Sequence, residues 1–341
     1  MSPRHSPTPP AWLAGRCLGR LASGLTVATA LAFGVASGCS SASGAPTEKS
    51  PEKAQFFYSA GAFAVGGAIT QINGKPPAEP LLVQAATLLP PSGGKGVGRI
   101  EKAFQYGPVE TKDAKWVITV GSASAEVNGT QDGDCHVTTV TNTITDLNVL
   151  GRIEAARLVI EAESRHCLKG SARETRFHVV RATFDGLRID GVLLQPELAK
   201  SFAGAQTFSE LAAGQQAAYE RSQREHAAAG GTSVAAADGR RPGPSDGMSL
   251  DRRLLLTSIF APVGEGQLND LQKANKHPEA GRYRLLADNG IHVPDLGNVH
   301  FGRCLVDRNK RETVMLHLEL GSPVKGPIDI GGEYGNGVDY P

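Results

Sequence analysis

Two cysteine–histidine pairs are the first residues in this sequence that could carry chemistry. Cys135-His136 and His166-Cys167 offer the two thiolates and two imidazoles of a tetrahedral zinc site. If the chain between them forms a hairpin that turns at 150–152, Cys135 lies opposite Cys167 and His136 opposite His166. Neighbouring side chains of a strand point to opposite faces, so the cysteines share one face and the histidines share the other. This separation predicts a cross-strand disulfide, with two free buried thiols and a metal site as the alternatives.

A second group of candidate residues is spread over the C-terminal part of the chain. It comprises two acids and three histidines: His292, Asp295, His300, His317 and Glu319. Side chains of these types could act as metal ligands or as general acids and bases of an exported hydrolase. No pair has the spacing of H-E-x-x-H, so scattered surface histidines are the simpler interpretation. The enzyme hypothesis predicts a concave site in which at least three of the five converge within ligand reach, and the sequence itself assigns no catalytic, cofactor-binding or metal-ligating residue.

Two further motifs have a structural interpretation. The run Gly93–Gly98 contains the glycines of a phosphate loop, but Gly96 replaces the hydroxyl residue that must follow Lys95, and no helix is predicted after it. We interpret this run as a flexible turn. Cys304 is left without a partner if the other two cysteines of the body of the chain pair, and an unpaired cysteine is more often a core residue than a reactive thiol.

The first 39 residues have the plan of an export signal. Arg4, Arg16 and Arg20 precede an apolar stretch at 21–33, and small residues then lead to Cys39. A cysteine directly after Ala-Ser-Gly resembles the lipobox of bacterial lipoproteins, in which the cysteine is lipidated and becomes the mature N-terminus. We therefore predict lipidation at Cys39, with a plain cleaved signal or an uncleaved anchor as the alternatives.

These signals divide the chain into three parts. Residues 1–38 are the predicted lipoprotein signal peptide, 39–55 a flexible tether rich in Ser, Ala, Pro, Glu and Lys, and 56–341 a β-rich domain. Export to an oxidising compartment permits the disulfide. The three arginines that leave with the signal reduce the 35 basic residues to 32, against 34 acidic residues, so the mature chain carries a formal charge near −2. This balance provides no basic field for nucleic acid.

The elements that must position these residues are mainly strands. Apolar residues alternate with other residues around 63–69 and 116–120, and neighbouring strands are predicted at 299–306 and 313–320, joined by a polar turn at 307–311. With 41 glycines and 21 prolines, turns are frequent. We predict a mainly β fold, an antiparallel sandwich or open barrel, with α+β as the alternative.

An insert at about 195–249 interrupts the strands. Thr207 and Glu210 have the spacing of a capping box, which predicts the start of one surface helix that runs to about residue 226. Residues 229–249 have the composition of a flexible loop. From residue 250 onward the pattern returns to strands, with Ile259 and Phe260 among the expected core residues.

Several segments resemble a family of uncharacterised bacterial exported proteins similar to the choice-of-anchor group, whose members attach to the envelope in different ways. The segments that carry this resemblance are 69–74, 83–90, 291–302, 311–316, 320–326 and 335–341. The resemblance implies an envelope location and a β-rich fold, and it implies no reaction.

The sequence thus favours a non-enzymatic, membrane-tethered envelope lipoprotein whose β domain acts as a binding or scaffold module. Its expected partners are a membrane, through the lipid on Cys39, and an envelope or extracellular ligand, with no nucleic acid and no cofactor. One alternative is an exported hydrolase or metal-dependent enzyme that uses the C-terminal His, Asp and Glu residues. Another is a structural component that self-associates through strand edges.

Overall fold

The computed structural model describes residues 55–109, 111, 114–167, 174–214, 255–275, 279, 281–286, 289–307 and 310–340. The predicted signal peptide, Cys39 with the rest of the tether up to residue 54, and the predicted loop at 229–249 lie outside the described residues. Among the described helices, none is long and apolar enough to cross a membrane.

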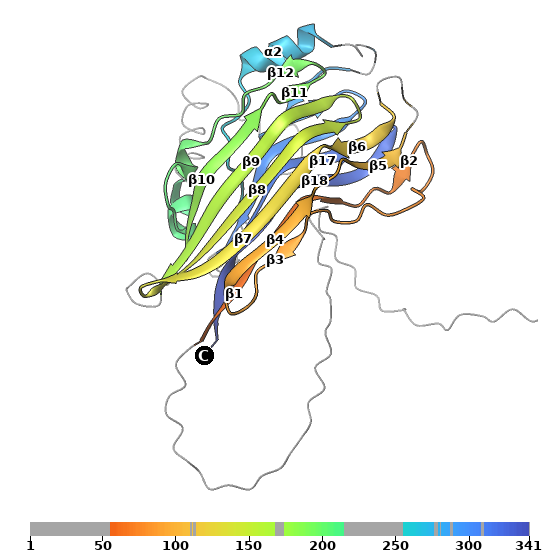
Figure 1. The fold of residues 1–341 in the computed structure, drawn as a ribbon. Helices are drawn as coiled ribbons and strands as arrows, with labels where there is room; N and C mark the ends of the chain where they lie inside the picture. The colour runs from red at the N-terminus through yellow and green to blue at the C-terminus, as the bar shows by residue number, and fades with distance from the viewer. Residues whose placement is uncertain are drawn as a thin grey trace, which may run out of the picture. The chain divides into compact units, whose positions relative to one another are not determined.

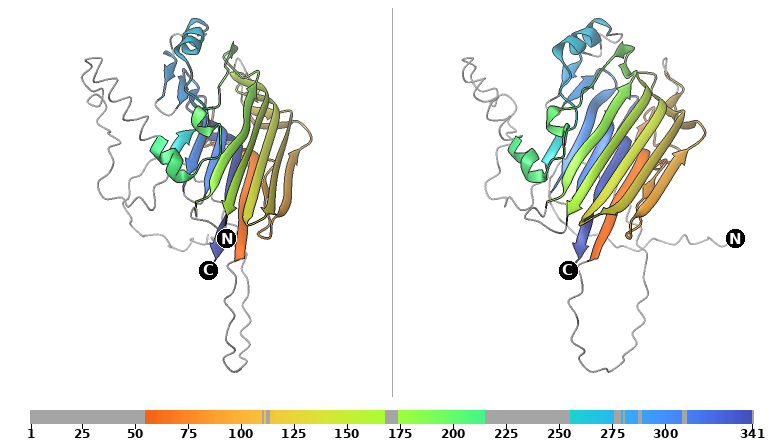
Figure 2. Two further views of the ribbon diagram at one scale, coloured as in Figure 1. Left: turned by 90° about the vertical axis from the view of Figure 1, so that its left-hand side faces the viewer. Right: turned by 60° about the vertical axis from the view of Figure 1, so that its left-hand side comes forward.

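The described residues form two antiparallel sheets that lie face to face, as Figure 2 shows most clearly, so the predicted mainly β, sandwich-like fold is confirmed. In spatial order the first sheet contains β14 (Arg284–Leu285), β15 (Gly290–Val293), β16 (Gly297–Val306), β17 (Arg311–Leu320), β18 (Val324–Tyr340), β1 (Gln55–Gly67) and β3 (Thr87–Leu88), with β13 (Leu255–Ser258) paired to β16 and β2 (Gln71–Ile72) paired to β18.

The second sheet is built around three long strands of one meander. In spatial order it contains β12 (Val192–Leu193), β11 (Arg188–Ile189), β9 (Ile153–Cys167), β8 (Cys135–Val149), β6 (Trp116–Val120) and β5 (Phe104–Pro108), with β10 (Arg176–Asp185) paired to β9, β7 (Ser122–Asp132) paired to β8, and β4 (Gly94–Ile100) paired to β7. Strand β8 shows why these residues form a sheet. Val140, Asn142 and Ile144 are buried, whereas Thr141 and Thr143 between them are half-buried on the outer face.

The hairpin of β8 and β9 has the predicted register. Cys135 pairs with Cys167 and His136 pairs with His166. The two cysteines form the predicted disulfide, and their Cα atoms are 4.0 Å apart. Both histidine rings pack against Phe56 of the first sheet, at centroid distances of 4.0 and 5.4 Å, so the histidines lie on the inner face, opposite to the disulfide. In the chain-entropy model a bridge over this many residues stabilises the fold by about 3–4 kcal/mol.

The predicted pair of C-terminal strands is present as β16 and β17, but their alternation is interrupted. Arg311, the first residue of β17, faces the second sheet, since its Nη1 donates to the Glu163 carbonyl over 3.1 Å. Leu316 also faces that sheet, because its cross-strand neighbour Phe301 packs on Phe184 at 6.2 Å between ring centroids. Residues five apart would lie on opposite faces of a regular strand, so the faces exchange between these two positions.

Two glycines, one in each of the strands on either side of β17, account for this exchange of faces. Gly302 of β16 and Gly331 of β18 flank Met315 and have φ values of 58° and 68°, a left-handed conformation that glycine adopts without the Cβ penalty. A Cβ on Gly331 would also lie 3.0 Å from the Cβ of Met315. Beyond this point His317 and Glu319 point away from the second sheet.

The turn predicted at 307–311 is one residue too long. Arg311 belongs to β17 and is fully buried, where its Nε and Nη2 donate to the two carboxylate oxygens of Glu333 over 3.0 and 2.9 Å. The sequence pattern placed Arg311 in solvent because basic residues are rarely buried without a paired acid. Here the acid comes from β18, 22 positions later.

The turn predicted for Gly93–Gly98 is wrong for most of its length, because residues 94–100 form strand β4. The glycines are required for a close crossing instead. A Cβ on Gly98 would lie 2.5 Å from the Ala85 carbonyl oxygen, and one on Gly96 would lie 2.7 Å from that of Leu88. The segment 85–88 therefore passes directly against the backbone of β4.

The predicted helix start is confirmed. Residues 208–214 are helical, the Glu210 amide donates to Thr207 Oγ1 over 3.1 Å, and the Thr207 amide donates to Glu210 Oε2 over 2.8 Å. A short 3-10 helix at Lys200–Phe202 precedes it. A further helix, α2 (Glu265–Lys273), occupies a stretch that the sequence pattern assigned to strands, so the expectation of one helix is wrong.

The two ends of the sandwich differ. At one end β1 begins and β18 finishes side by side, with Gln55 paired to Tyr340 (Figure 1). At the other end lie the β8–β9 turn, β11, β12 and α2. We call these the terminal end and the loop end.

Candidate functional site

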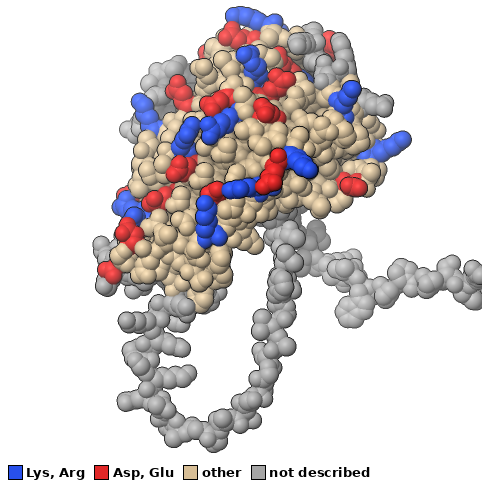
Figure 3. Space-filling model, viewed as in Figure 1, with Lys and Arg blue, Asp and Glu red and all other residues tan. Residues whose placement is uncertain are grey.

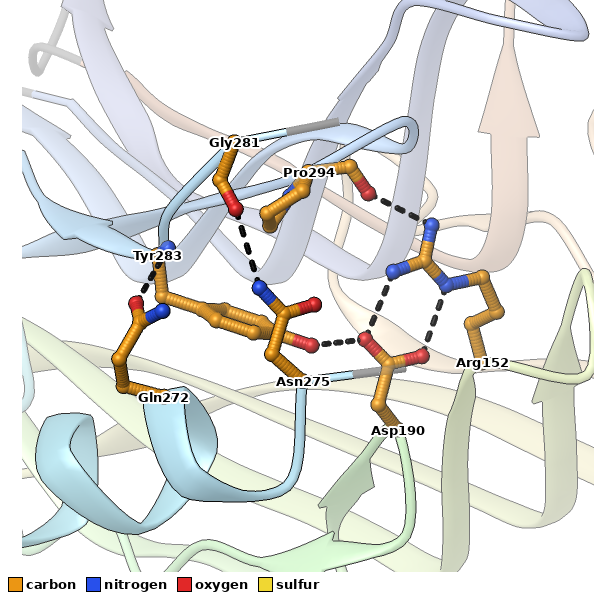
Figure 4. Close-up of polar contacts among 7 residues, drawn as sticks. All are labelled: Arg152, Asp190, Gln272, Asn275, Gly281, Tyr283 and Pro294. Atoms are coloured by element: carbon orange, nitrogen blue, oxygen red, sulfur yellow. Dashed lines mark hydrogen bonds and ion pairs between the residues drawn. The ribbon is translucent and has the colours of Figure 1, made fainter. Parts of the chain in front are cut away.

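A buried polar cluster at the loop end joins four segments of the chain. Arg152, in the β8–β9 turn, donates from Nε and Nη2 to the two carboxylate oxygens of Asp190, each over 2.7 Å. The Tyr283 hydroxyl donates to the same carboxylate, and Arg152 Nη1 donates to the Pro294 carbonyl over 2.7 Å (Figure 4). Asp190 is thus the common acceptor for an arginine and a tyrosine that are far from it in the sequence.

The electrostatics of this cluster are those of a permanent ion pair. Burial opposes the charge on Arg152, but the hydrogen bonds to Asp190, the negative charge of Asp190 and the contribution of Tyr283 together outweigh it, and the net result is a raised pKa of the guanidinium. Burial, followed by the hydrogen bond and the charge of Asp190, raises the pKa of the Tyr283 phenol well above its usual value. A tyrosine that does not ionise near neutral pH serves here as a hydrogen-bond donor.

Helix α2 holds Tyr283 in place. The Tyr283 amide donates to Gln272 Oε1 over 3.1 Å, and Asn275, just after the helix, donates to the Gly281 carbonyl over 3.0 Å (Figure 4). The cluster therefore fixes α2 to the second sheet through Arg152 and Asp190.

A pocket of about 340 Å³ opens beside this cluster. It is lined by hydroxyl, charged and apolar side chains: Thr111, Leu150, Arg152, Asp295, Leu296, Ser322 and Pro323. Asp295, one of the sequence candidates, is exposed at the turn between β15 and β16 and has a φ of 56°. The structure thus places Asp295 in the loop-end pocket.

The remaining sequence candidates come together on the outer face of the first sheet. His317 Nε2 lies 3.6 Å from Glu319 Oε1, and His300 Nε2 lies 3.8 Å from Glu319 Oε2. The His300 and His317 ring centroids are 5.6 Å apart. His292 joins them indirectly, since its Nδ1 lies 2.9 Å from Asn298 Oδ1 and Asn298 Nδ2 donates to Glu319 Oε2 over 2.9 Å. Four of the five candidates therefore belong to one cluster.

The interpretation of these residues as scattered surface histidines is wrong for two of them. His300 and His317 are 6% and 4% exposed, whereas the Glu319 side chain is 43% exposed. His317 also pairs with Asp329 of β18, with Nδ1 and Oδ1 2.6 Å apart. Their adjacency comes from cross-strand pairing, because His317 lies opposite both His300 and Asp329.

Glu319 is the half-exposed acid of this cluster. Burial raises the pKa of its carboxyl. The hydrogen bond from Asn298 and the positive potential of the nearby histidines and Arg303 lower it by a larger amount, so the net pKa is depressed. We call the six residues that make these contacts the histidine cluster: His292, Asn298, His300, His317, Glu319 and Asp329. Within the described part of the chain, no three or more His, Cys, Asp or Glu side chains are already arranged to hold a metal ion.

The outer face of the second sheet is the least specific candidate. Basic and acidic side chains alternate across it, as in the pair Lys95–Glu126 at 2.8 Å and the pair Arg165–Asp132 at 2.9 Å (Figure 3). A shallow groove of about 240 Å³ crosses β4, β7 and β8 beside the first pair. Its lining of hydroxyl, amide and paired charged groups selects no particular chemistry.

Cys304 is a core residue, as expected. It is the free cysteine among the described residues, and burial raises the pKa of its thiol to about 12. A thiol with that pKa carries almost no thiolate near neutral pH and is a poor nucleophile.

Residues 56–239, more than half of the chain, match the model of a family described as a domain of unknown function, DUF8256. The chain belongs to the DUF8256 family. No curated protein matches the chain, and no solved structure matches it.

The residues that match the DUF8256 model include part of the loop-end cluster and none of the histidine cluster. The match includes Arg152 and Asp190 and every strand of the second sheet, and it ends before β13. Tyr283 and the whole histidine cluster lie beyond the matched residues. The loop-end cluster thus joins the DUF8256 region to the C-terminal part of the chain.

Sequence reasoning missed Arg152, Asp190, Tyr283, Asn298 and Asp329. The first three are 38 and 93 positions apart, and no local spacing relates them. A signal for Asp329 was available in principle, since pairing of 313–320 with a following strand places some residue opposite His317, but that register was not predicted.

Proposed function

We propose that this protein is a lipid-anchored module of the bacterial cell envelope that binds its partner through the loop end of its β-sandwich. The observation that carries the proposal is the separation of the two ends. The chain enters the sandwich at the terminal end, whereas the pocket lined by Arg152 and Asp295 lies at the loop end.

The proposed anchor fits this polarity. Cys39 follows Ala-Ser-Gly in the lipobox-like sequence, and β1 begins at Gln55, only 16 positions later. A lipid on Cys39 would hold the terminal end close to the membrane surface. The resemblance to choice-of-anchor proteins supports the same envelope location.

The proposed binding end projects away from the membrane in this arrangement. Strand β8 has 15 residues and runs from Cys135 near the terminal end to Val149 at the loop end. At about 3.3 Å per residue, these ends are about 45 Å apart. The pocket and the turns around it would thus be the part of the domain most accessible to a ligand on another molecule.

An exported hydrolase is a second candidate function, because four of the five side chains that it would use lie in one cluster. His300, His317 and Glu319 meet within 4 Å, and Asp329 orients His317 as a carboxylate orients the histidine of a general base. The two functions are compatible, since the histidine cluster and the loop-end pocket use different residues.

The anchor is tested by the intact mass of the protein extracted from host membranes. We expect a chain that starts at Cys39, carries added acyl chains and contains one disulfide. In the Cys39→Ala variant, the acyl mass and the membrane association should both be lost. An unlipidated wild-type chain, or a variant that stays in the membrane fraction, would contradict the anchor.

The binding end is tested by photocrosslinking in the host. A photoreactive amino acid at position 295 is compared with the same residue at position 134, an exposed site near the terminal end. We expect a discrete adduct from position 295 and none from position 134. Equal adducts from both positions, or none from position 295, would count against a partner at the loop end.

A further inference from the structure

The loop-end pocket contains one negative charge that no neighbouring group balances. Two charged side chains line the pocket, Arg152 and Asp295. Arg152 is neutralised by Asp190, which accepts from its Nε and Nη2, and its Nη1 donates to the Pro294 carbonyl, each over 2.7 Å (Figure 4). The side chain of Asp295 makes no hydrogen bond or ion pair with any residue that the structure describes. The carboxylate of Asp295 therefore gives the pocket an attraction for a cation.

The remaining lining of the pocket is mostly apolar. Leu150 and Leu296 are 4% and 1% exposed and form its floor, and Pro323 lines the pocket with them. Asp295 and Ser322, in contrast, are exposed at its rim. An apolar floor favours the hydrocarbon part of a ligand, whereas the rim offers a carboxylate and a hydroxyl to a polar group. The pocket thus suits a ligand with an apolar stem and a positive end.

Leu150 lies in a backbone conformation that leucine rarely adopts. Leu150 and Gly151 form the two-residue loop between β8 and β9, with φ values of 54° and 68°. Such loops favour Asn-Gly or Asp-Gly, and the chain has these pairs at 73–74 and 190–191, also with positive φ. A leucine is unfavourable for the turn itself. The apolar floor is therefore present against the local preference of the backbone, as is common at binding sites.

The pocket is formed without a ligand. The Leu150 amide donates to the Val117 carbonyl over 3.0 Å, and the Gly321 amide donates to the Leu296 carbonyl over 2.8 Å. The second bond holds the turn that follows β17 beside the turn that precedes β16. A ligand that enters does not have to order these walls. The volume of about 340 Å³ is at the small end of the range for ligand sites and is enough for one long side chain with its adjoining backbone.

From this combination we propose that the pocket receives a cationic side chain, lysine or arginine, of a partner protein. Its aliphatic stem would lie on Leu150 and Leu296, and its charged group would pair with Asp295. Both side chains have this form, a flexible apolar stem that ends in a cation. An anionic group would be repelled by Asp295, and a purely apolar one would leave that carboxylate without a partner. This ligand class rests on the proposed function, since it assumes a partner at the loop end.

The test uses the full-length protein in detergent micelles with isotope-labelled leucine methyl groups. The probes are Nα-acetyl-lysine methylamide, its norleucine analogue, which lacks the ammonium group, and its glutamate analogue. We expect the lysine probe to shift the methyl signals of Leu150 and Leu296 saturably, with a dissociation constant in the millimolar range. The norleucine probe should bind roughly tenfold more weakly, and the glutamate probe should not bind. Equal binding of the lysine and norleucine probes would overturn the proposal.

A variant of the rim identifies the group that holds the cation. Asp295→Asn removes the charge and preserves the backbone, because asparagine tolerates the φ of 56° as aspartate does. It should weaken binding of the lysine probe about tenfold. Asp185→Asn, which removes an exposed carboxylate at the end of β10, is the matched control and should leave the affinity unchanged. An unchanged affinity of Asp295→Asn would overturn the proposed pairing. Tighter binding of the free diamine cadaverine than of the lysine probe would overturn the assignment to a protein side chain.

Photocrosslinking in the host separates this proposal from the proposed function. A photoreactive residue at position 111, which lines the pocket, leaves Asp295 in place. We expect Asp295→Asn to reduce the yield of the adduct, and Asp185→Asn to leave it unchanged. An unchanged yield in Asp295→Asn would keep the partner at the loop end and overturn the cationic ligand. Absence of an adduct from both positions 111 and 295, with binding of the lysine probe intact, would instead overturn the partner at the loop end.

Discussion

Asp190 supports more of the structure than any local feature of its sequence suggests. Its two carboxylate oxygens accept hydrogen bonds from Arg152 and Tyr283, and Arg152 continues the chain of contacts to the Pro294 carbonyl. Each of these residues comes from a different segment, so the cluster holds together parts of the chain that are far apart in the sequence. Every polar side-chain atom of Arg152, Asp190 and Tyr283 has a hydrogen-bond partner, which makes any single truncation costly.

We therefore predict that Asp190→Asn destabilises the protein far more than Tyr283→Phe. The first change leaves the buried Arg152 without its counter-charge and should lower the free energy of unfolding by about 3–5 kcal/mol. The second removes one hydrogen bond and should cost about 1–2 kcal/mol. Urea denaturation followed by circular dichroism measures both values. Equal losses would show that the charge of Asp190 is not the important contribution.

The residues of the histidine cluster show how far sequence reasoning reached at this scale. The residue types were sufficient to identify His300, His317 and Glu319 as candidate site residues. The alternation of the strands alone, however, suggested dispersed surface side chains. The convergence depends on the pairing of His317 with residues of both β16 and β18 and on the change of face at Gly302 and Gly331. The pattern of apolar residues in the sequence does not show where a glycine inside a strand adopts a left-handed conformation.

At the scale of single elements, β4 shows how a glycine-rich strand can be mistaken for a turn. Its side-chain-free positions at Gly96 and Gly98 face the backbone of 85–88, which includes the edge strand β3 of the facing sheet. Composition alone favoured a loop, because glycine is rare in strands unless another backbone comes close. The close approach is a tertiary contact and cannot be derived from the strand itself.

Substitution of Gly98 by alanine should test this crossing. The new Cβ would lie 2.5 Å from the Ala85 carbonyl oxygen, so the strands must separate, and we expect a loss of about 1–3 kcal/mol in the free energy of unfolding. Gly204→Ala is the matched control, since nothing lies within 4 Å of its Cβ, and its effect should stay within about 0.5 kcal/mol. Both are measured by thermal or urea unfolding. A Gly98→Ala variant as stable as the control would refute the crossing.

Elements with a local signal were predicted well. The capping box at Thr207 set the helix start, and the cysteines fixed the register of the β8–β9 hairpin through a single pair, because each shift by one residue would separate them. Helix α2 was missed because Gly266 and Asn269 weaken its propensity, and it is held instead by its buried Leu271 and its contact with Tyr283.

At the scale of the whole molecule, the first and last strands complete one sheet. Strand β1 pairs with β18 from Gln55–Tyr340 to Gly67–Ile328, and β18 also pairs with β17 on its other side. Pairing over nearly the full length of the domain is a non-local contact that slows folding. The sheet therefore cannot be completed before the C-terminal segment is available.

Removal of residues 324–341 should consequently prevent folding of the entire domain. Strand β1 would lose its long partner, the buried Arg311 would lose Glu333, and the core of the first sheet would be exposed. We expect loss of the cooperative unfolding transition and digestion by protease under conditions in which the full chain resists. A truncated chain that still unfolds cooperatively would show that the remaining strands form a stable unit on their own.

The paired ends of β1 and β18 also determine how the domain would respond to mechanical force. In the proposed arrangement, the lipid pulls on Gln55 at the terminal end while a partner holds the loop end, so tension runs along the strand axis. The hydrogen bonds between β1 and β18 lie across that axis and share the load together in shear, instead of opening one after another as in a zipper. An envelope module attached in this way can transmit tension between a membrane and its partner without peeling its own anchor strand from the sheet.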